Sequence, residues 1–409
     1  MTRSPRLPSA FYLVLASQGI SLIGSEMQQI ALPLWVYQET GSAVSTGLAF
    51  AVQFVPIVLL APWAGYIADR FDRKRLMLTC ELLAAFFVAI TLVSLHFHVI
   101  PVVVLASATT RVFNAVTMPA MQAIIVSTVP EEGRARGASL SSTLFAIVQV
   151  IAPIAGTGVA GTLGFQVVLA IDITSFLISA LLLLPLPACP GVPSLRQPVR
   201  ATWHAFRDHA SRLLRAALAT EAVFFLLWGA DSALALLILE NDFGQASAGA
   251  FATAMGVGWV VASMAIPARF KRRPVLMIAG GAACGPVAAI AFVALVPHGL
   301  LAAFLPGVLV GVGNLAVVIG ATTIFQQEAG KEVAGRLFAV RRATLNSMLT
   351  LSYLLLPAVS AGGLGQKATL IVFSLLMFVA VQVLVRFVLR PAVTAARPPA
   401  AAESVVPHD

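Results

Sequence analysis

The stretch GYIADRFDRKR, from Gly65 to Arg75, directly follows a long apolar run. Seven of its eleven residues are glycine or charged, and the charges run acid, base, acid and then three bases. A shorter stretch of similar character, RFKRRP, lies at Arg269–Pro274. The 409-residue chain is 59% hydrophobic and 11% charged, with a mean hydropathy of +0.93. Soluble domains are about 45–50% apolar and about 25% charged, so these stretches are predicted to be loops of a polytopic membrane protein.

The apolar segments between such loops fix the predicted number of helices. Crossing roughly 30 Å of hydrocarbon takes about 20 residues of α-helix. Twelve segments qualify, which predicts an all-α polytopic membrane protein with twelve transmembrane helices. The predicted helices are 11–37, 44–67, 76–97, 101–127, 138–162, 166–187, 213–238, 246–267, 274–297, 299–325, 338–361 and 367–389.

The positive charges predict the orientation of these helices. With the N-terminus inside the cell, 24 of the 26 Lys and Arg residues fall on inner segments, among them Arg341. The two exceptions are Lys367, in an outer loop, and Arg111, inside the fourth helix. Because Lys and Arg are retained on the cytoplasmic side, both termini are expected in the cytoplasm. The net charge of +9 is therefore attributed to membrane orientation, and no nucleic-acid partner is expected.

The chain also repeats internally. Arg70–Lys74 aligns with Arg269–Arg273 at an offset of 199, and Glu132 and Arg136 align with Glu332 and Arg336 at an offset of 200. Two six-helix pseudo-repeats with the same orientation are typical of transporters, whose substrate site lies between the halves. The predicted division is a first half 1–187, a linker 188–212, a second half 213–390 and a disordered cytoplasmic tail 391–409. The end of the linker is either a short basic amphipathic helix or a plain connection.

The residues Gly65-x-x-x-Asp69-Arg70-x-x-Arg73-Lys74 resemble the loop signature of the major facilitator superfamily. The resemblance covers essentially the whole chain and implies alternating access to a small-molecule site. Asp72 stands where the signature favours glycine. Further motifs are similar to the macrolide-efflux and enterobactin-exporter branch. These motifs are Ala31–Leu34, Thr40–Ser42, Pro119–Ala120, Val129–Glu131, Ile171–Leu177 and Gly335–Arg336.

Two efflux signatures are incomplete. The fourth helix has Arg111 and Asn114 where the family pattern has arginine, glutamine and glycine. The fifth helix keeps Pro153 and Gly156, which are expected to allow bending and close helix approach, but it lacks most of the expected glycines. Transport is still implied, whereas the implication of proton antiport is weaker.

The resemblance implies that the loop after the second helix acts as a cytoplasmic latch. Asp69 is expected to lie against the start of the eleventh helix, near Leu337–Arg341, where the helix dipole favours an acid. The alternative for the basic residues is that they only fix orientation. The expected latch residues of both halves are Gly65, Asp69, Arg70, Arg73, Lys74, Glu132, Arg136, Arg269, Arg272, Glu332 and Arg336.

Five ionisable residues lie within predicted helices and away, or nearly away, from their ends, where each costs about 2.5–3.5 kcal/mol at a helix centre and therefore needs a partner or water. They are Glu26, Arg111, Asp172, Glu221 and Asp231. Glu26 and Asp231 lie on the first and seventh helices, which line the central cavity in the superfamily, and Arg111 is the expected counter-charge. Asp172 is expected to join neighbouring helices, and Glu221 to reach the inner interface. The expected cavity residues are Glu26, Gln29, Arg111, Asn114, Trp228 and Asp231; the alternative for each is a structural polar contact.

These features predict a secondary active exporter of a hydrophobic or amphiphilic small molecule, driven by protons, in the bacterial cytoplasmic membrane. An importer or facilitator on the same fold is the alternative, and a non-transporting sensor or scaffold is a more remote one. Catalytic residue sets, phosphate-binding loops and metal-ligand spacings are not found in the sequence, so neither an enzyme nor a cofactor or metal is predicted. The expected partners are substrate, protons and lipid, with a monomer as the functional unit.

Overall fold

The computed structural model describes residues 7–190, 206–208, 210–265, 273–328, 334–359 and 365–396. Twelve long helices lie in this part of the chain, six in each half. The first six are α1 (Ser9–Thr40), α2 (Ala43–Arg70), α3 (Arg73–His96), α4 (Ile100–Thr128), α5 (Glu131–Leu163) and α6 (Phe165–Leu183). The second six are α8 (Arg212–Phe243), α9 (Gln245–Ala265), α11 (Pro274–Leu295), α12 (Leu300–Glu328), α13 (Ala334–Val359) and α14 (Gln366–Leu384).

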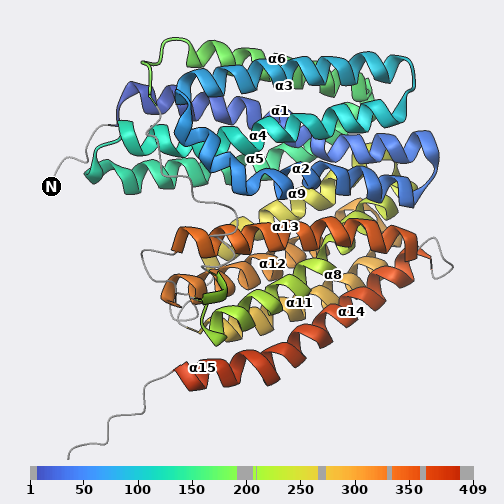
Figure 1. Ribbon diagram of the computed structural model, residues 1–409. Helices are drawn as coiled ribbons and strands as arrows, with labels where there is room; N and C mark the ends of the chain where they lie inside the picture. Colours follow the sequence, from blue (N-terminus) through green and yellow to red (C-terminus); the bar gives the residue numbers. More distant parts are fainter. Residues whose placement is uncertain are drawn as a thin grey trace, which may run out of the picture.

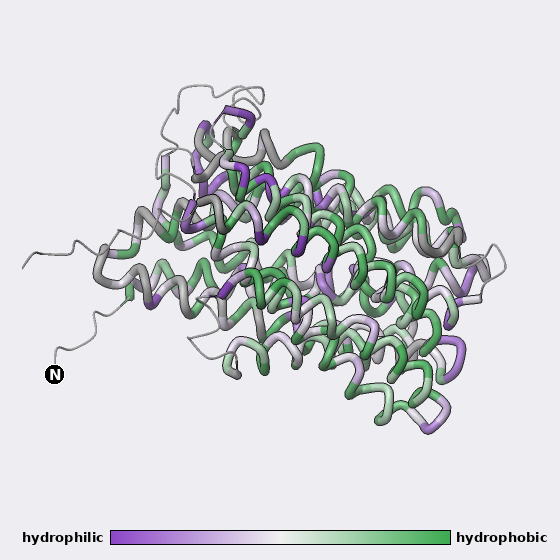
Figure 2. Tube along the Cα trace, turned by 90° about the horizontal axis from the view of Figure 1, so that it is seen from below, coloured by the Kyte–Doolittle hydropathy of each residue, from purple (hydrophilic) through white to green (hydrophobic). Residues whose placement is uncertain are grey.

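The helices form two bundles that lie side by side, α1–α6 in one and α8–α14 in the other (Figure 1). Nine of the described helices are long and apolar enough to cross a membrane, and α9 contributes a shorter apolar stretch, Gly249–Met264. Hydrophobic residues run along the middle of the helices, and hydrophilic residues gather mostly toward the two ends of the molecule (Figure 2). The predicted all-α polytopic fold with two six-helix repeats is confirmed.

The two ends of the bundle differ in charge. We call the end where α2 meets α3 the basic end, because Arg70, Arg73, Lys74 and Arg75 lie there. We call the other end, where α1 meets α2 and α8 meets α9, the opposite end. At this end α1 and α8 each stop at a glycine with positive φ, Gly41 (62°) and Gly244 (85°), a conformation that other residues rarely adopt.

The two bundles contact each other along α5 with α9 and along α2 with α13. The α5–α9 contact is close because small residues face the neighbouring backbone. A Cβ atom on Gly249 would collide with Thr157 and the Pro153 carbonyl, and the Thr253 hydroxyl donates to the Val150 carbonyl at 3.0 Å. Small residues of this kind let membrane helices approach closely.

Further contacts between the bundles lie toward the opposite end. Phe50 and Phe54 of α2 stack on Tyr353 of α13, with ring centroids 5.0 and 5.6 Å apart. The Tyr37 hydroxyl of α1 donates to the Asn241 side chain of α8 at 3.0 Å. In this structure the bundles are therefore joined between their middle and the opposite end.

Two expectations about the helix limits were wrong. α5 begins at Glu131, seven residues before the predicted start, so Glu132 and Arg136 lie on its first turns and not in a loop. Beyond α14 the helix continues through a π-helical turn, Val385–Leu389, and α15 (Arg390–Ala396). The first residues of the predicted disordered tail 391–409 are thus helical, as their alanine content favours. The rest of that tail and most of the linker lie outside the described residues.

Candidate functional site

A polar cluster in the N-terminal bundle surrounds Arg111 of α4, whose side chain is buried. Its guanidinium donates to the Ser25 carbonyl of α1 at 2.9 Å and to the Gln53 amide oxygen of α2 at 3.4 Å. Asn114, one turn further along α4, donates to the Ser25 hydroxyl at 3.3 Å. Both side chains therefore join α4 to α1, at mid-length of three helices that are otherwise mainly apolar.

Glu26 lies next to this cluster on α1 and is partly accessible. Its carboxylate interacts electrostatically with Arg111, and Gln149 of α5 is its neighbouring hydrogen-bond donor. The Gln53 amide donates to the Gln29 carbonyl at 3.3 Å, so Gln29 contributes its backbone to the cluster. Of the six predicted cavity residues, Glu26, Gln29, Arg111 and Asn114 are thus brought together. Gln149 was missed, because a single glutamine in an apolar helix carries no distinguishing signal.

The corresponding face of the C-terminal bundle is aromatic. Trp228 of α8 is buried beside Phe224 and Phe225, with ring centroids 6.5 and 5.7 Å away. Its indole N–H has no hydrogen-bond partner among the described residues. Asp231 lies one turn along the same helix, but its side chain is outside the described part of the structure. α8 therefore brings aromatic surface to the level at which α1 carries charge.

The C-terminal bundle contains an ion pair that was not predicted. Arg341 of α13 donates to both carboxylate oxygens of Glu221 on α8, at 2.7 and 2.5 Å, and the two side chains are 10% and 0% exposed. The guanidinium also lies over the rings of Phe325 and Phe338, 5.4 and 6.0 Å from their centroids. Arg341 was counted among the inner basic residues, at the start of the eleventh helix, and it lies there in a buried pair; the expectation that Glu221 reaches the inner interface was wrong. Arg341 lies seven residues inside α13, which begins four residues before the predicted start at 338.

Two further acids are buried between α1, α3 and α6. The Glu81 carboxylate of α3 accepts a hydrogen bond from Gln18 at 3.3 Å, and Ser21 and Ser179 lie close to it. Asp172 of α6 accepts from the Ser175 hydroxyl at 3.4 Å, and α1 packs against it at Gly24, where a Cβ atom would collide with both side chains. Asp172 is thus buried where α1 meets α6, but its hydrogen bonds with Ser175 stay within α6, so the expected bond to a neighbouring helix stays a prediction.

The loop between α2 and α3 is anchored on its own bundle. Asp72 caps α3 by accepting from the Arg75 amide at 2.9 Å, and its φ of −58° needs no glycine. The Lys74 ammonium donates to the carbonyls of Leu184 and Leu186 at 2.7 and 2.5 Å, which satisfies the end of α6. The Arg73 amide donates to the Cys189 carbonyl at 2.9 Å. These contacts fix the loop against the residues that follow α6.

The structure describes the remaining predicted residues to different extents. Arg70 and Arg136 are exposed at the basic end. Gly156 lies against the Met27 backbone of α1, where a Cβ atom would come within 2.7 Å, and the Pro153 carbonyl accepts from Thr157 at 2.9 Å. Some predicted residues lie on described helices, but nothing is described of their side chains: Gly65, Asp69, Glu132 and Arg336. Others lie entirely outside the described residues: Arg269, Arg272 and Glu332.

Comparison with known proteins agrees with this architecture. The family model of the Major Facilitator Superfamily matches residues 14–351. The chain belongs to this superfamily, and it is a membrane transporter by family. The fold is also that of a bacterial homologue of the human lysosomal transporter Spinster, in an inward-facing and unoccupied conformation. That structure has a TM-score of 0.74 at 14% identity and is covered over its full length, with 97% of this chain.

Two curated transporters are similar to part of this chain. Macrolide efflux protein A of Streptococcus pyogenes is 27% identical over 173 residues, which is 42% of this chain and 43% of that protein. The Staphyloferrin A transporter of Staphylococcus aureus is 29% identical over 268 residues, which is 63% of this chain and 66% of that protein. The matched region spans less than half the length of the macrolide efflux relative.

Proposed function

We propose that this chain is a secondary active transporter that exports a hydrophobic or amphiphilic small molecule by alternating access, with proton antiport as the driving reaction. The observation that carries the proposal is Glu26, a partly accessible acid that interacts with the buried Arg111 in the middle of the N-terminal bundle. An ionisable group at mid-bundle needs a counter-charge or water, and such residues mark ion and substrate pathways. The similarity to a macrolide efflux protein supports the substrate class.

The aromatic surface of α8 fits this class of substrate. Phe224, Phe225 and Trp228 gather three large aromatic rings on α8, and the indole N–H has no partner among the described residues. Binding sites for drug-sized ligands are mainly apolar and aromatic, with few polar groups. A sugar or phosphate would need many more donors than this face offers. Energetically, one proton crossing about 100 mV supplies roughly 2.3 kcal/mol, which supports a gradient of about fiftyfold.

In the proposed cycle the two bundles rock against each other about the α5–α9 and α2–α13 contacts. The opposite end, which is joined in this structure, faces the exterior, and the basic end faces the cytoplasm together with both termini. The loop carrying Asp69, Arg70, Arg73 and Lys74 then serves as the latch that closes the basic end. The chain works in the bacterial cytoplasmic membrane as a monomer with substrate, protons and lipid as its partners.

The test is transport by purified protein in liposomes. Glu26→Gln and Asp231→Asn are compared with the unaltered protein for uphill transport of a cationic dye, with and without a pH gradient. Asp242→Asn is the control, because Asp242 is a surface acid already paired with Lys367 at 3.0 Å. If Glu26 carries the proton, its variant loses uphill transport and keeps exchange down a gradient. Full pH-driven uphill transport by both variants would exclude proton coupling through either acid.

A transporter for siderophores is the second candidate, and the Staphyloferrin A transporter supports it. The direction of transport separates the possibilities. Cells lacking an exporter accumulate the compound, whereas cells lacking an importer are depleted of it. Uptake of labelled macrolide and of a ferric siderophore by a deletion strain, with and without the gene restored, distinguishes export from import for both classes.

A further inference from the structure

Glu240, in the last turn of α8, lies at the opposite end between the two bundles. Its side chain is 8% exposed, and neither carboxylate oxygen has a hydrogen-bond partner among the described residues. Gln38 of α1, across the boundary between the bundles, is a side-chain donor that interacts with Glu240. The next residue, Asn241, accepts the hydrogen bond from Tyr37 of α1. Glu240 is therefore enclosed where the closed opposite end brings α1 against α8.

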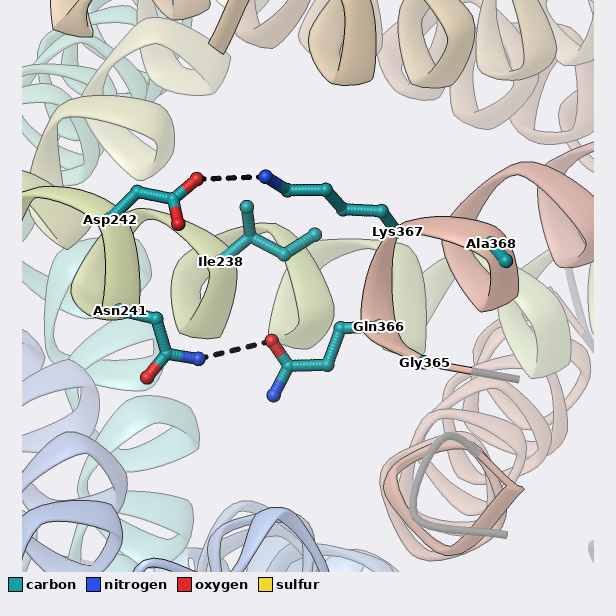
Figure 3. Close-up of a pocket in the computed structure, with 7 residues that line it drawn as sticks. All are labelled: Ile238, Asn241, Asp242, Gly365, Gln366, Lys367 and Ala368. Atoms are coloured by element: carbon teal, nitrogen blue, oxygen red, sulfur yellow. Dashed lines mark hydrogen bonds and ion pairs between the residues drawn. The ribbon is translucent and has the colours of Figure 1, made fainter. Parts of the chain in front are cut away.

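The other acids at this end have partners within their own bundle. Glu39 of α1 pairs with His98, 3.3 Å away, in the turn after α3. Asp242 pairs with Lys367 of α14 at 3.0 Å, and the Asn241 amide donates to Gln366 at 3.2 Å. Figure 3 shows both contacts reaching from α8 to α14 across a surface cavity of about 490 Å³. No described cation is paired with Glu240.

A carboxylate in this position is unfavourable when the end is closed. Enclosing an ionised carboxylate without a hydrogen bond or a counter-charge costs several kcal/mol, whereas the neutral acid is tolerated far better. When the bundles separate at this end, water reaches the side chain and the ionised form becomes favourable. Closing thus favours binding of a proton, and opening favours its release.

We propose that Glu240 is a proton-binding site at the opposite end, whose protonation closes the contact between α1 and α8 and whose ionisation opens it. The proton comes from water on that side and returns to it, so no other reactant is needed. This site rests on the proposed function in one respect, which is that the same two bundles must separate during the transport cycle. It is distinct from Glu26, which lies inside one bundle and does not face the boundary at this end.

The test measures the closure directly. In a background without Cys80, Cys189 and Cys284, spin labels are attached at Thr40→Cys and Phe243→Cys, which end α1 and α8. The distance distribution is recorded in lipid nanodiscs between about pH 5.5 and about pH 8.5. One proton changes the ratio of closed to open forms by up to about tenfold per pH unit. The unaltered protein is expected to close as the pH falls.

Two variants and one control decide the result. Glu240→Gln keeps the shape of the neutral acid and is expected to remain closed at every pH, and Glu240→Ala is also expected to lose the pH dependence. Asp242→Asn removes a neighbouring acid that already has a partner, and it is expected to behave as the unaltered protein does. The Glu39–His98 pair is intact in all of them, so its contribution is common to all four curves.

The proposal is overturned if both Glu240 variants keep the pH dependence, or if the unaltered protein shows none. Drug export in cells is measured separately. A protein that closes with protonation of Glu240 but exports no macrolide or dye would contradict the proposed function and leave this site standing. The opposite result is a protein that exports normally but whose Glu240 variants close with unchanged pH dependence. It would contradict this site and leave the proposed function standing.

Discussion

Replacing Arg341 with methionine tests the buried ion pair of the C-terminal bundle. The substitution keeps an unbranched side chain beside Phe325 and Phe338 but leaves Glu221 buried with no counter-charge. Two charge-assisted hydrogen bonds, at 2.7 and 2.5 Å, are lost, each worth about 1.5–3 kcal/mol. Removing one partner of a buried pair costs about 3–5 kcal/mol. Both arguments give the same expected loss of stability, about 3–5 kcal/mol, or a factor of about a hundred or more in the unfolding equilibrium.

The measurement is the denaturant dependence of unfolding for purified protein in detergent, followed by tryptophan fluorescence. Lys367→Met is the matched control, because it breaks the Lys367–Asp242 pair, in which the side chains are 45% and 35% exposed. Such a surface pair is worth less than about 1 kcal/mol. The double variant Glu221→Gln with Arg341→Met removes both charges and should recover most of the loss. If Arg341→Met costs no more than Lys367→Met, the burial argument for this pair is refuted.

Three other substitutions test the contacts between helices. Gly249→Leu should abolish transport and lower the thermal midpoint, because its side chain collides with α5, whereas Gly280→Leu, which faces open space, should leave both unchanged in the same assays. Lys74→Met should lower stability by about 1–2 kcal/mol in denaturant titrations, because the end of α6 loses its cation, and a value near zero would contradict the capping role. Asp69→Asn should keep normal membrane levels on immunoblots and lose export, and normal efflux would rule out the latch.

The number and approximate ranges of the helices could be predicted because they depend on hydrophobicity summed along the sequence. Runs of about 20 apolar residues decide how many helices can span a membrane, whereas the orientation inferred from Lys and Arg stays a prediction. Twelve long helices are found among the described residues, close to the predicted ranges. The repeat was visible in the sequence itself, because Arg70–Lys74 and Arg269–Arg273 align at an offset of 199.

The ends of helices were less predictable, because a charged residue is compatible with both a loop and the first turns of a helix. Glu132 and Arg136 were assigned to a loop, yet only Val129 and Pro130 separate α4 from α5. Arg341 was placed at the start of the eleventh helix, but its buried pairing was not predicted. Its partner, Glu221, lies 120 residues away, and only the packing of α8 against α13 brings the two together.

The polar cluster was partly predictable, because a buried arginine requires acceptors and Glu26 was the obvious neighbouring acid. The acceptors themselves were not, since Arg111 uses the Ser25 carbonyl and the Gln53 amide. A backbone carbonyl leaves no trace in the sequence. Glu240 could not be recognised either, because an acid in the last turn of a helix is ordinary at a surface. Only the approach of α1 encloses it.

Equivalent positions of the two bundles are occupied by different kinds of residue. Asn114 of α4 and Asn314 of α12 are 200 residues apart, as the repeat requires, but the equivalent of Arg111 is Gly311. At Gly311 a Cβ atom would collide with the Met255 carbonyl of α9, so the glycine permits close packing. The same place in the N-terminal bundle holds a cation bonded to α1 and α2. One repeat thus uses this position for close helix packing, and the other uses it for a buried charge.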